Sequence, residues 1–201
     1  MGNTGLWIPK PFDAEDAGKG FEEDGLRIIF LDVDGVLNCE TTKESYGRYI
    51  GVEGKKISIL KKIIDGSCEE VETKIVLSST WRVGVNRDGT IVPMMYQYLQ
   101  DRLKDYGLAI YNRTPYIKLK PYAHGDNRGE EIAVWLISHL ELHITGYLVL
   151  DDCVFPDYER YGIMPHLLKT AGNGTEGGGG LQEYHIKQAL EILSKPIASD
   201  R

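Results

Sequence analysis

Acidic residues follow two apolar stretches of the sequence, at the point where each stretch ends. The stretch LRIIFL leads into Asp32 and Asp34, and the stretch GYLVL leads into Asp151 and Asp152. If both stretches are parallel strands of one sheet, their carboxyl ends meet at one edge and the four carboxylates converge there. Like charges this close require a cation, and hard oxygen ligands suit Mg²⁺, which also binds substrate phosphate. The pattern therefore predicts a magnesium site in which one aspartate can attack phosphorus.

These residues need a scaffold, and the hydrophobic pattern predicts one in which strands alternate with helices. Strands are expected at 26–33, 73–78, 108–111 and 146–150, with a weaker one near 166–170, and helices at 55–65, about 92–106, 128–141 and about 181–194. Alternation of this kind implies right-handed crossovers and a mainly parallel sheet. The predicted fold class is α/β, with a five-stranded sheet and helices on both faces. Asn127 is the expected cap of the helix at 128–141, with Glu130 as its reciprocal partner.

Three segments resemble successive motifs of the haloacid dehalogenase (HAD) superfamily of phosphotransferases. IIFLDVDGVLN is similar to the first motif, KIVLSS to the second and YLVLDD to the fourth. The segments stand in the family's order over residues 26–170, about three quarters of the chain. The resemblance implies a HAD-like Rossmannoid fold.

The same resemblance implies a role for each matching residue. Asp32 would be the nucleophile that forms an aspartyl-phosphate. Asp34 would protonate the leaving oxygen and then activate the hydrolytic water, while its main-chain carbonyl binds the metal. Ser78 would donate a hydrogen bond to a phosphoryl oxygen, and Asp152 with Asp151 would hold Mg²⁺ directly or through water. An aspartate two residues after the nucleophile goes with phosphatases and phosphotransferases rather than with the dehalogenases.

The third motif of the superfamily is a single Lys or Arg that opens the helix before the fourth-motif strand. Arg128 stands at that place in this sequence. A cation at a helix N-terminus opposes the helix dipole at a cost of roughly 0.3–1 kcal/mol, which hints at a catalytic purpose. Lys118 and Lys120 are the alternatives, because all three cations lie in one short segment.

Longer segments carry a closer resemblance. SSTWR, RGEEIAVWL and the late HLLKT…GL element are similar to the small HAD domains of multifunctional RNA-repair proteins, and in outline to polynucleotide 3′-phosphatases. This resemblance makes a polynucleotide end the first substrate expectation, and a nucleotide or other small phosphomonoester the second. The expected substrate-binding residues are Ser79, Arg82, Lys118 and Lys120; Trp81, next to Arg82, is as well explained as a core residue.

The lengths of the connections limit the size of any cap over the site. Asp34 and Ser78 are separated by 43 residues, and a helix and a strand use about half of them. The remainder, roughly 39–54, has room only for a small flap, which would carry Tyr46 and Arg48. No large cap fits, and an open site favours a phosphate at the end of a polymer or on a protein.

Length and composition describe one domain with a short tail. Residues 1–22 show no hydrophobic period and are expected to be a tail, whereas 23–201 form the hydrolase domain with a mobile glycine-rich loop at 171–180. The formal net charge of −7 argues against coating long nucleic acid. Three cysteines without CxxC spacing, no apolar stretch of 18 residues and no secretory pattern predict a cytoplasmic protein away from membranes. The oligomeric state is left open.

The sequence thus predicts a magnesium-dependent phosphomonoester hydrolase, and two other classes stay in view. A phosphoacceptor signalling domain also combines paired acids with an acceptor aspartate. In that fold the paired acids end the first strand, whereas here they end the fourth. A metal nuclease is the other alternative, because clustered acids also bind two metals. Retained phosphate on Asp32 would indicate the first class, and cleavage of internal phosphodiesters the second.

Overall fold

The structure is a computed structural model of the chain. It describes residues 25–67, 70–82, 93–117, 127–171, 178–195 and 197. The expected tail (1–22), Lys118, Lys120 and residues 172–177 of the expected mobile loop lie outside the described residues.

A five-stranded sheet with all strands parallel forms the centre of the molecule. Its strands are β1 (Leu26–Leu31), β4 (Glu72–Leu77), β5 (Ile110–Arg113), β6 (Ile144–Asp151) and β7 (Leu167–Lys169). Their order across the sheet is β5-β4-β1-β6-β7, so β1 is central. The α/β fold with a parallel five-stranded sheet is thereby confirmed.

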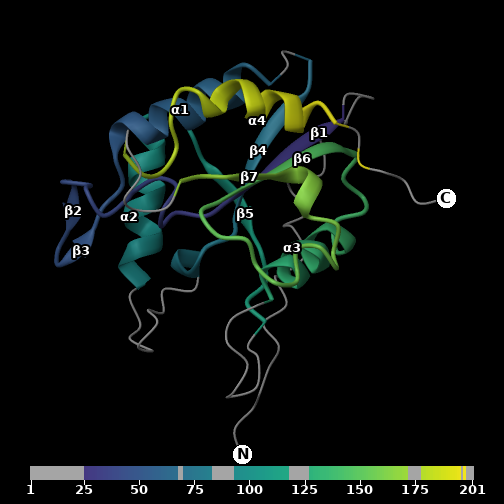
Figure 1. Cartoon of the computed structure of the whole chain (residues 1–201), viewed down its shortest axis with the longest axis horizontal. Helices are drawn as coiled ribbons and strands as arrows, with labels where there is room; N and C mark the ends of the chain where they lie inside the picture. The colour runs from purple at the N-terminus through teal and green to yellow at the C-terminus, as the bar shows by residue number, and fades with distance from the viewer. Residues whose placement is uncertain are drawn as a thin grey trace, which may run out of the picture.

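Helices cover both faces of the sheet, as predicted. The helices α1 (Gly54–Asp65), α2 (Pro93–Lys104) and α4 (His185–Leu193) pack on one face, and α3 (Arg128–Ile137) packs on the other. Figure 1 shows α1 and α4 side by side along one face, with α3 across the sheet from them. The described residues also form two short 3-10 helices, η1 (Thr80–Arg82) and η2 (Met164–His166). None of the described helices has the length and apolar character needed to cross a membrane.

The central strand explains why the first apolar stretch carries almost no polar residue. Ile29 and Leu31 enter the core under α1, α2 and α4, whereas Ile28 and Phe30 enter the core under α3. A strand buried on both faces requires apolar side chains at successive positions rather than at alternate ones. On the α3 side, the Phe30 ring meets the ring of Trp135 edge-on, with centroids 5.4 Å apart.

Some observed boundaries of strands and helices differ from the predicted ones. The third strand starts at Ile110 rather than at Leu108, because the N–H of Leu108 donates to the Leu103 carbonyl and closes the turn after α2. Helix α3 ends at Ile137 rather than at 141, and Leu140, within the predicted helix, is 80% exposed. These positions lie at element ends, where local propensity is weakest.

Asn127 is the N-cap residue of α3, as predicted, but the side-chain capping hydrogen bond expected of it is absent. The Asn127 side chain makes no capping hydrogen bond and donates instead to the carbonyl of Ile117 at 2.7 Å. The carboxylate of Asp157 takes its place, accepting from the N–H groups of Gly129 (3.1 Å) and Glu130 (2.9 Å). A carboxylate there satisfies free N–H groups and complements the helix dipole, which a contact across 28 residues of sequence can supply as well as a local one.

A small hairpin occupies the segment where a flap was expected. Its strands are β2 (Ser45–Tyr46) and β3 (Tyr49–Ile50), joined by a tight turn in which Gly47 has a φ of +60°. Positive φ is readily adopted by glycine and is typical of two-residue hairpin turns. In Figure 1 the hairpin stands at one end of the molecule, beside α2. Among the described residues between Asp34 and Ser78, the elements are this hairpin, α1 and β4.

Candidate active site

Residues that follow the central strands reach the same level of the sheet. Leu31, the last residue of β1, pairs with the last residue of β4 and with Leu150 of β6. Asp32, Ser78 and Asp151 come next in this register. The N–H of Asp32 donates to the Leu150 carbonyl (2.9 Å), and the N–H of Ser78 donates to the Leu31 carbonyl (2.8 Å). The convergence expected from the sequence therefore has a structural basis in the strand register.

Beside β1, the chain reverses the direction in which it adds strands to the sheet. From β1 the chain builds outward through β4 to β5, and it then returns to add β6 on the other side of β1. In parallel sheets the crevice at such a point is where ligands bind. Because side chains alternate along a strand, Asp32 points to the same face as Phe30, which is the face covered by α3.

Arg128, the first residue of α3, reaches this row of acids. Its Nη1 atom lies 3.4 Å from Oδ1 of Asp32 and 3.6 Å from Oδ2 of Asp151. Its Nε atom lies 3.9 Å from the carboxylate of Glu131, and its guanidinium stands 5.0 Å from the centre of the Phe155 ring. The residue at the expected third-motif position is thus in contact with the expected nucleophile, whereas Lys118 and Lys120 are not described.

Burial dominates the electrostatics of the two buried acids. Removal from water, with the negative charges of Asp151 and Asp34 nearby, raises the pKa of the Asp32 carboxyl to about 7, although Arg128 opposes the rise. Burial likewise raises the pKa of Asp151, again against the effect of Arg128. One arginine does not compensate the negative charge of the site, so a second cation is favoured there.

The donor set fits a hard divalent cation. Carboxylate oxygens of Asp151 and Asp152 lie within 4.8 Å of each other and of the Cys153 sulfur. A Cβ atom placed on Gly35 would fall 2.3 Å from Oδ2 of Asp152, so that carboxylate lies against the turn that follows Asp34. Burial and Asp152 raise the pKa of the Cys153 thiol to about 11. Carboxylate oxygens predominate in this donor set, whereas structural zinc sites are built mainly from cysteine and histidine, so the set suits Mg²⁺ better than zinc.

Asp151, the last residue of β6, and Asp152, which follows it, differ in their surroundings. Oδ1 of Asp151 accepts from the Cys153 N–H at 2.9 Å, and Oδ2 accepts from the Tyr158 hydroxyl at 2.9 Å in addition to facing Arg128. Both oxygens of Asp151 are therefore used within the protein. Asp152 is partly exposed and faces the turn after the first strand, which makes it the better placed of the two to hold a metal directly.

Asp34 lies at the open edge of the site and is exposed. Its Oδ2 accepts from the indole N–H of Trp81 at 3.0 Å, and its Oδ1 accepts from the Asn38 amide at 3.0 Å. The carboxylate of the expected general acid is thus held from two sides, by residues that the sequence did not assign to the site.

Both serines after β4 are buried, but only one hydroxyl lacks a partner. Ser78 Oγ has no hydrogen-bond partner among the described residues. A buried hydroxyl without a partner costs free energy, and a phosphoryl oxygen bound beside Asp32 would supply one. The Ser79 hydroxyl accepts from the Trp81 N–H at 3.4 Å and is close enough to Asp32 to lower the pKa of that carboxyl. Ser79, expected to bind substrate, is thus fully buried beside the expected nucleophile.

Arg82 does not extend toward the open edge, where it was expected to contact substrate. Its side chain is 2% exposed and forms a close ion pair with Glu131. Its guanidinium also donates to the carbonyls of Ser79 (2.7 Å) and Pro115 (3.2 Å). A buried guanidinium needs such partners, and these hold the group inside the protein, although its Nε atom has no partner among the described residues. Arg82 instead joins the turn after β4 to helix α3.

The segment that follows the acidic pair holds residues that sequence reasoning missed. Phe155 packs under the Arg128 guanidinium, Asp157 caps the helix that begins with Arg128, and Tyr158 is fully buried with its hydroxyl on Asp151. Each contact orients a charged group of the site. The only sequence signal was an aromatic and acidic cluster, FPDY, close behind the fourth motif.

Replacing Arg128 should destabilise the protein strongly. Arg128→Gln leaves Asp32 and Asp151 buried without their shared cation, so we expect the free energy of unfolding to fall by about 3 kcal/mol or more. Urea unfolding measures the change. Arg160→Gln is the matched control, because Arg160 is exposed and should change the free energy by less than about 0.5 kcal/mol. Equal effects of the two substitutions would contradict the buried ion-pair network.

Together the fold and the site define a HAD-superfamily domain, a hydrolase domain of the phosphatase type. A comparison with family profiles agrees and is more specific. The family described as "HAD domain in Swiss Army Knife RNA repair proteins" matches residues 28–177, and the chain belongs to it. No curated protein and no solved structure matches the chain.

Proposed function

We propose that the protein is a magnesium-dependent phosphomonoester hydrolase that acts through an aspartyl-phosphate on Asp32. The observation that carries the proposal is the buried, unpartnered hydroxyl of Ser78 at the same level as the Asp32–Arg128 pair. A phosphoryl group at this place would meet a nucleophile, a hydrogen-bond donor and a cation together. HAD domains generally use Mg²⁺, and the oxygen donors of the site suit it.

The side chains of the site can carry out both halves of the reaction. An oxygen of Asp32 attacks phosphorus and the ester bond breaks, while Asp34 gives its proton to the departing oxygen. Asp34 then takes a proton from water, whose oxygen attacks phosphorus and releases phosphate and free Asp32. Ser78 and Arg128 hold phosphoryl oxygens throughout. Bound Mg²⁺ would neutralise phosphoryl charge, held by the carboxylates of Asp32 and Asp152 and the main-chain carbonyl of Asp34.

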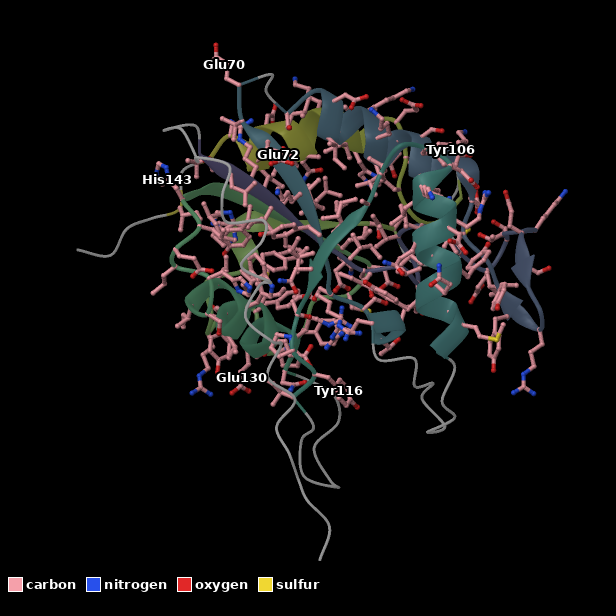
Figure 2. All side chains as sticks on the ribbon, turned by 180° about the vertical axis from the view of Figure 1, so that it is seen from behind. Glu70, Glu72, Tyr106, Tyr116, Glu130 and His143 are labelled. Atoms are coloured by element: carbon pink, nitrogen blue, oxygen red, sulfur yellow. The ribbon has the colours of Figure 1, made fainter. Side chains whose placement is uncertain are left out.

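The first proposed substrate is a polynucleotide end, and Tyr116 supports it. Tyr116 lies in the loop after β5, is 45% exposed and has the Arg82 guanidinium 5.7 Å from its ring centre. Figure 2 shows Tyr116 and Glu130 together at one end of the molecule, with Glu72 and His143 toward the other end. An exposed aromatic ring near the carboxyl ends of the strands can stack on a base without reading its sequence.

Phosphate release from a panel of substrates tests the proposed function. The panel contains 3′-phosphate and 5′-phosphate oligonucleotides, nucleotides, sugar phosphates, a phosphopeptide and an aryl phosphate, each with magnesium. We expect release from phosphomonoesters, with the lowest KM for an oligonucleotide end. Stable phosphate on Asp32 would replace the proposal with a phosphoacceptor domain, and cleavage of internal phosphodiesters would replace it with a nuclease.

Removing the Tyr116 ring tests the substrate class. Tyr116→Ala should raise KM for an oligonucleotide phosphate by roughly fivefold or more, because one base loses its stacking partner. The KM for an aryl phosphate should not change. Tyr184→Ala is the control, since Tyr184 is 68% exposed but precedes α4, on the opposite face of the sheet from α3. If KM for both substrates rises alike, or if neither rises, a small-molecule phosphatase is the better description.

A further inference from the structure

The proposed general acid is exposed, yet its orientation is fixed by two hydrogen bonds. The Trp81 indole donates to Oδ2 of Asp34, and the Asn38 amide donates to Oδ1, each at 3.0 Å. The Oδ1 atom of the same Asn38 amide accepts from the Gly35 N–H at 3.1 Å. An exposed carboxylate without such partners would sample several rotamers. The two donors limit it to one direction.

Trp81 is itself held firmly. It is 4% exposed and lies in η1, the turn that begins directly after the two serines that follow β4. Its own N–H donates to the Ser79 hydroxyl, and the next residue, Arg82, is locked by its ion pair with Glu131 of α3. The buried Arg82 therefore contributes to this site, because its contacts fix the turn that carries the Trp81 indole.

A tyrosine links Trp81 to the hairpin. The Tyr98 ring on α2 lies 6.4 Å from the Trp81 ring, centre to centre, and is stacked on Tyr46 of β2 at 4.6 Å. The Tyr98 hydroxyl accepts from the Val52 N–H at 3.2 Å, just after β3. The Tyr98 side chain therefore contacts β2 and the backbone just after β3, and it lies beside the indole that binds Asp34.

We propose that Trp81 is a positioning residue that holds Asp34 in the direction needed for proton transfer, with Tyr98 as its support. This inference rests on the proposed function. A general acid must be within hydrogen-bond reach of the leaving oxygen, about 2.6–3.2 Å between heavy atoms. Each carboxylate oxygen has two acceptor sites, so the indole can hold Oδ2 and leave a site for the transferred proton.

This role predicts a particular kinetic pattern. A good leaving group, such as an aryl oxide, departs with little protonation, whereas an alkyl oxide needs the acid. Because Asp34 also activates water in the second half of the reaction, the leaving-group effect belongs to the phosphorylation of Asp32, measured in a single turnover. Loss of the indole N–H should lower this phosphorylation rate for alkyl phosphates and spare it for aryl phosphates, with little change in the affinity for either substrate. General loosening of the site would lower the phosphorylation rate for both substrates alike.

Trp81→Phe tests the inference, since phenylalanine keeps an aromatic ring and removes the donor. We expect the single-turnover rate of Asp32 phosphorylation by an alkyl phosphate to fall by roughly 10-fold to 100-fold, as for loss of a charge-assisted hydrogen bond, and the rate with an aryl phosphate by about threefold or less. The matched control is Trp135→Phe. Trp135 is equally buried, but its indole N–H has no partner among the described residues, so both substrates should be affected alike and weakly.

A measurement in solution separates this inference from the proposed function. The indole N–H resonance of Trp81, assigned by its loss in Trp81→Phe, should shift in Asp34→Asn, whereas that of Trp135 should not. An unmoved Trp81 resonance would overturn the inference whatever the enzyme does. Unchanged leaving-group dependence in an active Trp81→Phe would overturn it too. Wild-type protein without phosphatase activity would refute the proposed function, and the positioning role with it.

Discussion

Asp32→Asn should abolish phosphate release while leaving the fold intact. An amide oxygen is a poor nucleophile and a neutral ligand, so the substitution removes the attacking atom and weakens the metal site at once. We expect turnover to fall by roughly 10³-fold or more, as for other covalent nucleophiles. Phosphate release with magnesium and an aryl phosphate measures the loss, and a trapped phosphate on wild-type Asp32 is the complementary observation.

The stability of this variant should change little. The substitution is nearly isosteric, and Arg128 keeps Asp151 and Glu131 as partners after the Asp32 charge is lost. Thermal unfolding should therefore shift by only a few degrees. Asp105→Asn is the control for charge removal, because Asp105 forms an exposed ion pair with Arg102 on α2. More than a few per cent of wild-type activity in a contaminant-free Asp32→Asn preparation would show that another group attacks phosphorus.

Chelation should eliminate activity, and magnesium should restore it. The site gathers Asp32, Asp151 and Asp152 around one arginine, and phosphate would add further negative charge. Without a divalent cation, both the binding of phosphate and the attack of a carboxylate on it are opposed by repulsion. Calcium should restore little, because its higher coordination number would displace Asp32 relative to phosphorus. Activity that survives exhaustive chelation would exclude a metal-dependent mechanism.

Asp152→Ala locates the metal. Both carboxylate oxygens of Asp151 already have partners within the protein, so Asp152 is the better placed of the two acids to bind the metal. Its loss should therefore weaken magnesium binding by roughly tenfold or more, measured by calorimetry. The metal-free variant should be at least as stable as wild type, since one charge leaves a repulsive cluster. Cys153→Ser is the control and should leave magnesium affinity unchanged, because the neighbouring thiol is not an expected ligand. The opposite ranking of these variants would place the cation elsewhere.

Much of this protein could be predicted from the sequence because its active-site residues follow apolar strands directly. Asp32, Ser78 and the Asp151–Asp152 pair are local features, and the rule that parallel strands end at one edge brings them together without further information. The helices and strands that carry them were also recognisable, because burial on one or both faces leaves a periodic pattern in the sequence. The chain length between Asp34 and Ser78 predicted only that any insertion there is small; that it is a hairpin was decided by the structure.

The tertiary structure decided which polar side chains face the site and which hold it together. Arg82 appeared to be a substrate ligand, but its partner Glu131 lies 49 residues away, and Trp81 meets Asp34 across 47 residues. Asp157 caps α3 from a loop that lies beyond the next strand. A buried charge or donor takes whichever partner packing brings within about 3 Å, and sequence periodicity carries no information about such pairs. The reactive residues at the strand ends are therefore encoded locally, whereas the orientation of their side chains depends on contacts that exist only in the folded chain.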